Sequence, residues 1–210
     1  MKTNIRYKVL SGRERSAFTL VEMLAVLVIL AVMISVSARM FRGGMVGQRL
    51  AVAARQLASD MKYAVLTAAK EDLPVEVRVL RFRSVDPPGE AHFRAYQLAV
   101  FMGLDVRGEP EYRQLTPVRR FPDGIILAPG ADATTVVKLP RRAARNGEFT
   151  AFPGCEIVAF NIRPDGRSSL PRQPMPCLTL MEETSASTGG LPSNFWTVAM
   201  DADTGFVKLY

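Results

Sequence analysis

The chain has 210 residues, of which 48% are hydrophobic and 22% are charged, and this size and composition fit one globular domain with a single core and exclude a second one. The net charge of +7 and the isoelectric point near 9.8 point toward an anionic partner. The first 17 residues hold five basic side chains and one acid, however, so only +3 of that charge belongs to the rest of the chain. Basicity alone is therefore weak support for a nucleic-acid-binding protein.

An apolar segment follows the basic leader 1–17 and extends from Phe18 to Ala38. The run from Met23 to Ala38 has no charged residue, and together with Phe18 to Leu20 it reaches roughly the 20 residues that a helix needs to cross a bilayer. A basic flank stays in the cytoplasm while the chain that follows it is exported. The sequence thus predicts a transmembrane helix over residues 18–41, with the N terminus cytoplasmic and the later domain outside the cytoplasm.

Glu22 places one carboxylate inside this apolar segment. A charge near the bilayer core costs several kcal/mol unless it is paired, so Glu22 requires a cationic partner. Two simpler interpretations remain open. One is an ordinary secretory signal cleaved after Ala38, and the other is an uncleaved signal anchor with Glu22 at the membrane interface.

The N-terminal segment consists of a basic leader, a small residue, Phe18-Thr19-Leu20-Val21-Glu22 and an apolar helix, in that order. This order resembles the class III signal of type IV prepilins and of the pseudopilins of type II secretion. The resemblance implies that a prepilin peptidase cuts between Ala17 and Phe18 and that the new amine is methylated. It also implies that the protein is an inner-membrane subunit and assembles with other pilin or pseudopilin subunits. In such an assembly, Glu22 of one subunit would pair with the Phe18 amine of a neighbour. Ala17 is a departure, because the family usually has Gly there.

The next segment, residues 42–73, predicts an amphipathic helix that continues the first one. Its apolar positions recur every three or four residues at Leu50, Ala53, Ala54, Leu57, Met61, Ala64, Val65 and Ala68. From Pro74 the pattern changes to short extended runs, so residues 74–210 form the exported, β-rich domain. A long helix followed only by strands predicts an α+β fold, in which the helix packs on an antiparallel sheet. Strands are expected over Val75–Phe82, Phe93–Met102, Gly124–Ala128, Thr134–Leu139, Glu156–Ile162, Cys177–Glu182, Phe195–Asp201 and Gly205–Leu209.

Two turn signals, Arg163-Pro164-Asp165-Gly166 and Asp201-Ala202-Asp203-Thr204-Gly205, are expected to close hairpins. A Pro-Asp-Gly turn after one strand and a Thr-Gly turn before the last resemble the H-type minor pseudopilins and the FimT-type minor pilins, whose fold is pilin-like. The inserts around Asp86-Pro87-Pro88-Gly89 and from Leu170 to Pro176 are similar to those of prepilin-like proteins known as Verru_Chthon cassette protein D.

Two cysteines, Cys155 and Cys177, fall in the exported part. An oxidising compartment permits a disulfide between them, which in the chain-entropy model would stabilise the domain by roughly 3 kcal/mol. Two reduced core cysteines are the alternative.

The remaining basic residues form two candidate clusters for nucleic-acid contact, Arg119 with Arg120, and Arg141 and Arg142 with Arg145. They support the alternative of a DNA-binding minor pilin for uptake; a signal-anchored periplasmic binding domain is another. His92 is the only histidine, so a catalytic dyad or a multi-histidine metal site lacks parts. No phosphate-binding or dinucleotide motif is present, and the sequence predicts neither an enzyme, a cofactor nor a metal site.

Overall fold

The computed structural model describes residues 19–85, 88–130, 132–145, 148–188 and 190–210. Contacts divide the chain into two compact units, Met1–Gly43 and Gly44–Tyr210. Helix α1, Leu20–Glu71, contributes residues to both, and its stretch from Leu20 to Gly43 makes up the described part of the first unit apart from Thr19.

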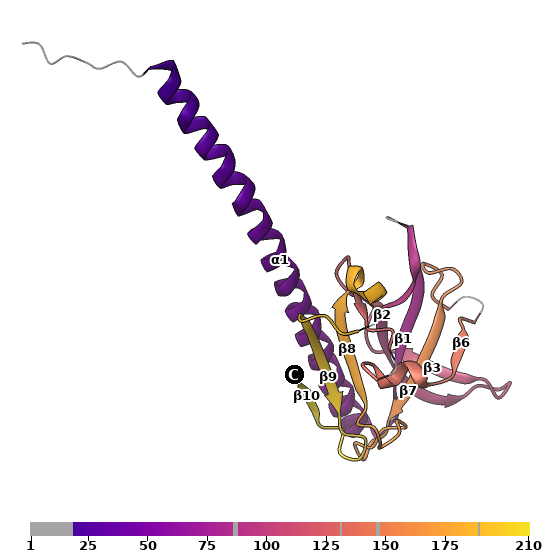
Figure 1. Cartoon of the computed structure of the whole chain (residues 1–210). Coiled ribbons are helices and arrows are strands. Elements are labelled where there is room, and N and C mark those ends of the chain that lie inside the picture. The colour runs from indigo at the N-terminus through magenta and orange to yellow at the C-terminus, as the bar shows by residue number, and fades with distance from the viewer. Residues whose placement is uncertain (1–18, 86–87, 131, 146–147, 189) are drawn as a thin grey trace, which may run out of the picture. The chain divides into compact units, whose positions relative to one another are not determined.

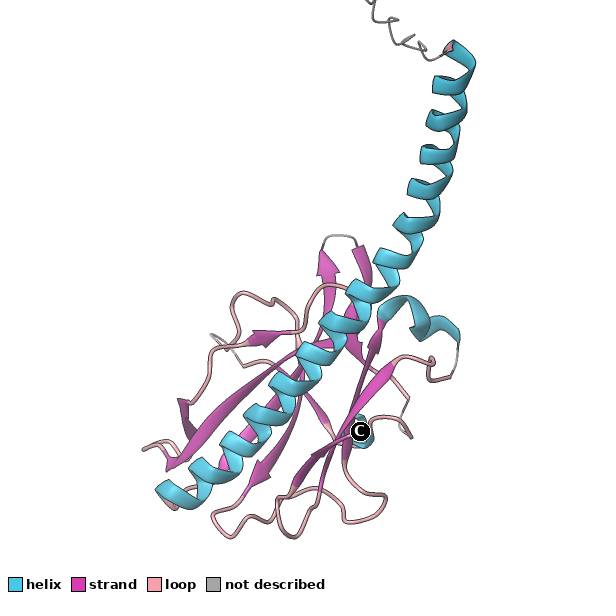
Figure 2. Cartoon of the chain, turned by 90° about the vertical axis from the view of Figure 1, so that its left-hand side faces the viewer, coloured by secondary structure: helices cyan, strands magenta, loops and turns pink. Residues whose placement is uncertain are grey.

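The second unit begins with the part of α1 after Gly43. As predicted from the three- and four-residue spacing, one face of this helix is buried, and alanine predominates on it. The helix ends where Asp72 adopts a positive φ of 54° and Pro74 follows two residues later, which is an ordinary way to stop a helix. Figure 2 shows this part of α1 crossing the strands. The buried apolar positions are Leu50, Ala53, Ala54, Leu57, Ala58, Met61, Ala64 and Ala68.

Within the described residues, the strands form two antiparallel sheets (Figure 1). The larger has the order β3-β2-β1-β7-β6, with β4 paired to β2, and the smaller has the order β10-β9-β8-β5. The larger sheet comprises β1 Val75–Val85, β2 Pro88–Leu104, β3 Pro110–Gln114, β4 Arg119–Arg120, β6 Arg141–Ala143 and β7 Glu156–Ile162. The smaller comprises β5 Ile125–Leu127, β8 Cys177–Glu182, β9 Phe195–Met200 and β10 Val207–Leu209.

The main core lies between the helix and both sheets. Alternate residues of β1, beginning with Val75, Val77 and Val79, point into it, as the two-residue repeat of a strand requires. The smaller sheet adds Leu180, Val198 and other apolar side chains to the same cluster. The α+β prediction, an N-terminal helix packed on antiparallel sheet, is therefore confirmed.

The two predicted turns are in direct contact with each other. Gly166 and Gly205 both have a positive φ, 83° and 69°. A Cβ atom on Gly205 would lie 2.7 Å from the carbonyl oxygen of Gly166 and 3.2 Å from both methyl carbons of Val65 on α1. The end of β7, the β9–β10 connection and the helix thus meet at a point that has no space for a side chain.

The sequence expectation was wrong over Thr134–Leu139, where the structure has the 3-10 helix η1, Thr135–Lys138. Thr134 and Thr135 explain the difference, because their hydroxyls bond to the backbone of β8. The Thr134 hydroxyl accepts from the Thr179 amide, and the Thr135 hydroxyl accepts from the Cys177 amide. Strands β3, β4 and β6 and the 3-10 helix η2, Glu183–Thr188, were not predicted. Each of these strands is short, and each of their side chains is at least partly exposed, so none has a clear apolar alternation.

Charged side chains from β1 are buried at the other face of the larger sheet. Glu76 is 7% exposed and Arg78 is 5% exposed. Arg78 donates through Nε to Glu76 Oε1 over 2.6 Å, and its Nη1 lies 3.2 Å from Glu148 Oε1. The Tyr112 hydroxyl of β3 donates to Glu76, and Arg142 of β6 donates twice to Glu148. We call these five residues the ionic network; it joins three strands of the sheet.

Candidate processing and assembly site

The described chain starts at the residue that caps α1. The Thr19 hydroxyl accepts a hydrogen bond from the Glu22 amide over 3.2 Å. In return, a Glu22 carboxylate oxygen accepts from the Thr19 amide over 2.9 Å and from the Thr19 hydroxyl over 3.0 Å. This reciprocal arrangement is a capping box, which satisfies backbone donors that a helix N terminus leaves without partners. Glu22 therefore has a local structural role besides the predicted ion pair.

This role of Glu22 was not predicted, although the sequence contains its signal. A Thr followed three residues later by Glu, directly before an apolar run, is the usual pattern of a capping box. Ala17 and Phe18, the residues of the predicted cleavage site, lie outside the described residues. The predicted cut and the pairing of Glu22 with the Phe18 amine stay predictions.

The large apolar side chains between Leu20 and Ile34 are all exposed, by 46% to 82%. A soluble protein rarely presents so much contiguous apolar surface unless it binds a partner or a membrane. Within the part of the chain that the structure describes, no helix combines the length and the apolar character that a membrane crossing requires.

Comparisons with known proteins bear on the N-terminal segment. Residues 12–38 match the family model of the prokaryotic N-terminal methylation motif. The prediction of a prepilin-type methylation motif is thereby confirmed. The match includes both residues of the predicted cut, the capping box and the apolar segment. No curated protein matches the chain.

Two solved structures of the minor pseudopilin EpsH from the type II secretion system of Vibrio cholerae are similar to the chain at low identity. The first is 12% identical, with a TM-score of 0.43, and the match covers 77% of this chain and 96% of that one. The second is also 12% identical, with a TM-score of 0.40 and coverage of 78% and 94%.

Most of the predicted nucleic-acid-contact residues are engaged by carboxylates. Arg142 donates to both oxygens of Glu148, Arg145 lies 3.1 Å from Glu109, and Arg141 lies 3.7 Å from Glu156. The hydrogen bonds that Arg142 donates to Glu148 raise the pKa of Arg142. A cation that is held by an acid offers little net charge to a phosphate. The second predicted cluster is thus distributed over three separate ion pairs.

Arg119 and Arg120 point to different surroundings, as successive residues of a strand do. Arg119 Nε lies 2.8 Å from the buried Asp60 carboxylate of α1, an ion-pair distance without the alignment of a hydrogen bond. Tyr96 donates its hydroxyl to the same carboxylate over 2.6 Å, and burial raises the pKa of that phenol. Arg120 instead lies near the aromatic rings of Phe82 and Phe152. The first predicted cluster is therefore divided.

The predicted disulfide does not form in the structure, where Cys155 and Cys177 are both free. Cys155 is buried in a small cluster with Leu80, Phe82 and Ile157 of the larger sheet. Cys177 begins β8 of the smaller sheet, and its thiol lies 3.3 Å from the carbonyl oxygen of Ala133. The two thiols thus belong to different packing layers, which the spacing in sequence did not indicate.

A second buried ion pair connects β2 to the start of η2. Arg94 is 7% exposed and donates through Nη1 and Nη2 to the Glu183 carboxylate, over 2.7 Å for Nη1. These hydrogen bonds hold the pKa of Glu183 below its usual 4.5. His92 Nε2 lies 3.9 Å from the same carboxylate, and the His92 side chain is only 12% exposed. His92 is thus largely covered, and burial and then Arg94 lower its pKa.

This pair predicts how stability depends on pH. The pKa of Glu183 is lowered on folding, so the unfolded chain binds more protons in acid, and the free energy of unfolding should fall as pH drops below about 4.5. Glu183→Gln should be less stable at pH 7 by about 1–3 kcal/mol, because Arg94 loses its counter-charge, and should lose less on acidification. Denaturant unfolding of both proteins between pH 7 and pH 3 measures this. Glu111→Gln, at an exposed position, is the control. If the free energy of unfolding of Glu183→Gln fell with pH as steeply as that of the unaltered protein, the prediction would be contradicted.

Proposed function

We propose that this chain is a minor pilin-like subunit, most closely of the H-type pseudopilin kind, that is cleaved by a prepilin peptidase, methylated and assembled into a secretion pseudopilus or pilus-like filament. The observation that carries the proposal is the N-terminal methylation motif over residues 12–38. It includes Ala17, Phe18 and Glu22, the three residues that the sequence resemblance assigns to processing and assembly.

In this proposal, residues 18–41 anchor the unassembled subunit in the inner membrane as a single pass. The exposed apolar side chains from Leu20 to Ile34 support this, because lipid or the helices of other subunits would remove them from water. The basic leader keeps the N terminus cytoplasmic and leaves the domain of residues 74–210 in the periplasm. The amphipathic stretch 42–73 joins the anchor to that domain.

Assembly depends on the charge of Glu22. Cleavage before Phe18 creates a cationic amine, and Glu22 of an adjacent subunit is its proposed partner. Within lipid or between packed helices, the pair neutralises two charges that would each be unfavourable alone. The subunit thus functions by association with its neighbours and not by turnover. The five arginines proposed for nucleic-acid contact are not part of this function, since four of them form ion pairs within the domain.

The first test is the N terminus of the protein isolated from membranes. Co-expression with a prepilin peptidase should remove 17 residues and leave a methylated Phe18, whereas cells without the peptidase should yield an intact Met1. Intact mass together with N-terminal sequencing distinguishes the two. Ala17→Gly restores the usual family residue and should be cleaved at least as fast, while a bulky Ala17→Leu should not be cleaved.

An intact Met1 terminus in both strains would refute the proposal and favour an uncleaved signal anchor. Cleavage after Ala38, with or without the peptidase, would instead identify an ordinary secretory signal.

A further inference from the structure

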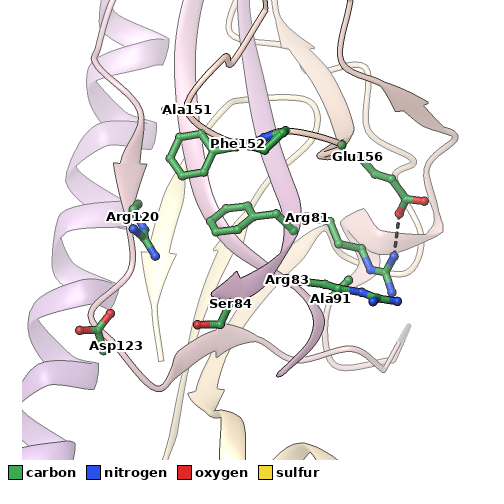
Figure 3. Close-up of a pocket in the computed structure, with 12 residues that line it drawn as sticks. Arg81, Arg83, Ser84, Ala91, Arg120, Asp123, Ala151, Phe152 and Glu156 are labelled. Atoms are coloured by element: carbon green, nitrogen blue, oxygen red, sulfur yellow. Dashed lines mark hydrogen bonds and ion pairs between the residues drawn. The ribbon is translucent and has the colours of Figure 1, made fainter. Parts of the chain in front are cut away.

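Two adjoining cavities lie beside the β1–β2 hairpin and share Ser84, Arg120 and Asp123 in their walls. Their volumes are about 650 Å³ and 350 Å³, which together fall in the usual range for small organic ligands. Figure 3 shows the larger one, with Arg120 and Asp123 on one side and Arg81, Arg83 and Glu156 on the other. The shared wall makes the two cavities one continuous cleft.

Arg120 is the central cation of this cleft. Pairing of β4 with Ala95 of β2 holds its backbone. Its guanidinium carbon lies 5.6 Å from the ring centre of Phe82 and 5.8 Å from that of Phe152, within the range of cation–π contact. Among the described residues, no carboxylate forms an ion pair with Arg120. Its charge is therefore available to a ligand.

A buried donor without a partner lies in the wall of the smaller cavity. Arg94 lines that cavity and is 7% exposed. Its two terminal nitrogens bond to Glu183, but its Nε has no hydrogen-bond partner in the described part of the chain. Buried donors are nearly always satisfied in folded proteins, so this Nε is an exception, and because the atom is shielded from solvent, a ligand in the cleft would meet the wall beside it and not the donor itself.

The acids of the cleft limit the charge of the ligand. Glu156 is held by Arg81 at 2.7 Å and by Arg141 at 3.7 Å, and Glu183 is held by Arg94. Asp123 adds a third carboxylate to the wall. With Glu156 and Glu183 neutralised by arginines, the wall keeps Arg83 and Arg120 against Asp123, a balance of one positive charge that suits a polyphosphate or a nucleic-acid strand poorly. A ligand with a single negative charge would match this balance at Arg120.

The remaining wall is aromatic. The rings of Phe82 and Phe152 pack against each other with their centres 4.7 Å apart. They provide an apolar surface next to the cation, and an apolar group that covered them would be favoured by its removal from water.

We propose that the cleft binds an organic monocarboxylate with an aromatic or apolar body, either a free acid or the end of a partner polypeptide. The carboxylate meets Arg120, and the body lies against Phe152. This is a binding site of the globular domain, and it does not depend on processing or filament assembly.

Binding is tested on the full chain in detergent micelles by ligand-observed NMR titration. The probes are 3-phenylpropanoate and its neutral amide, and the tetrapeptide Ala-Ala-Ala-Phe with a free or an amidated C terminus. Both acids should bind, and each amide should bind about tenfold more weakly, because it lacks the charge that Arg120 meets. Binding of the peptide acid alone would assign the source to a polypeptide, and binding of the free acid alone to a small molecule.

Arg120→Gln should weaken binding of the acids by about tenfold, whereas Arg107→Gln, at an exposed position outside the cleft, should leave it unchanged. The comparison of acid and amide on the unaltered protein needs no variant, so it stands even if Arg120→Gln fails to fold. Equal binding of acid and amide, no binding by either acid at about 10 mM, or tighter binding of an oligothymidylate would each overturn the proposal.

Discussion

Gly205→Ala is expected to lower the free energy of unfolding by roughly 2–5 kcal/mol. Two effects add. The residue has a φ of 69°, which a side chain disfavours, and its new Cβ would lie 2.7 Å from the Gly166 carbonyl oxygen. Backbone cannot move aside as a flexible side chain can, so the two turns and Val65 of α1 would have to separate. Denaturant unfolding followed by the fluorescence of Trp196, the only tryptophan, measures the change.

Gly154→Ala is the matched control. Gly154 has nearly the same φ, 70°, but nothing lies within 4 Å of the position that its Cβ would occupy. It should therefore cost only the conformational part, about 1–2 kcal/mol. If both variants lost the same stability, the contact between the two turns would contribute nothing, and the interpretation of that junction would be wrong.

Glu22→Gln is expected to reduce incorporation into filaments by about a hundredfold or more, corresponding to the 3–5 kcal/mol that breaking a desolvated ion pair costs. The proposal assigns Glu22 to the amine of a neighbouring Phe18, and glutamine removes the charge. Glutamine still accepts from the Thr19 amide, because Glu and Gln both serve in a capping box. Filaments sheared from cells and quantified by immunoblot, relative to the membrane pool, give the measurement.

Thr19→Ala separates the two roles of Glu22. It removes the hydroxyl that accepts from the Glu22 amide and leaves the carboxylate charged. Loss of an N-cap costs about 1 kcal/mol, so assembly should fall only a fewfold. If Thr19→Ala abolished assembly while Glu22→Gln did not, the capping box and not the ion pair would be the essential feature of this segment.

The sequence predicted those parts of the fold that have a clear apolar repeat. The buried face of α1 from Leu50 to Ala68 and the strands around Val77 and Phe160 were correctly placed, because one side of each faces the core. The error at Thr134–Leu139 has a tertiary cause. That segment is β-branched and apolar, but threonine hydroxyls bond it to β8 as a 3-10 turn, which no local pattern indicates.

Site residues that belong to a short sequence motif could be predicted, whereas those that depend on tertiary contacts could not. The order from Phe18 to Glu22 indicated the methylation motif that the family model matches. The arginines were grouped as clusters only because they lie close in sequence. In the fold, Asp60 of α1 engages Arg119 alone, and Glu148 engages Arg142. The unpartnered Nε of Arg94 likewise depends on a fold that brings β2 to Glu183.

The ionic network also constrains how the domain can change over evolutionary time. Arg78 pairs with both Glu76 and Glu148, and Glu148 pairs in turn with Arg142, so the four charges form one connected chain. Loss of Glu76 takes a counter-charge from Arg78, and loss of Arg78 takes the counter-charge from Glu76, in a place that water hardly reaches. Viable descendants should therefore keep all of these charges or replace them together by apolar residues, and sequences with one member missing should be rare among related domains.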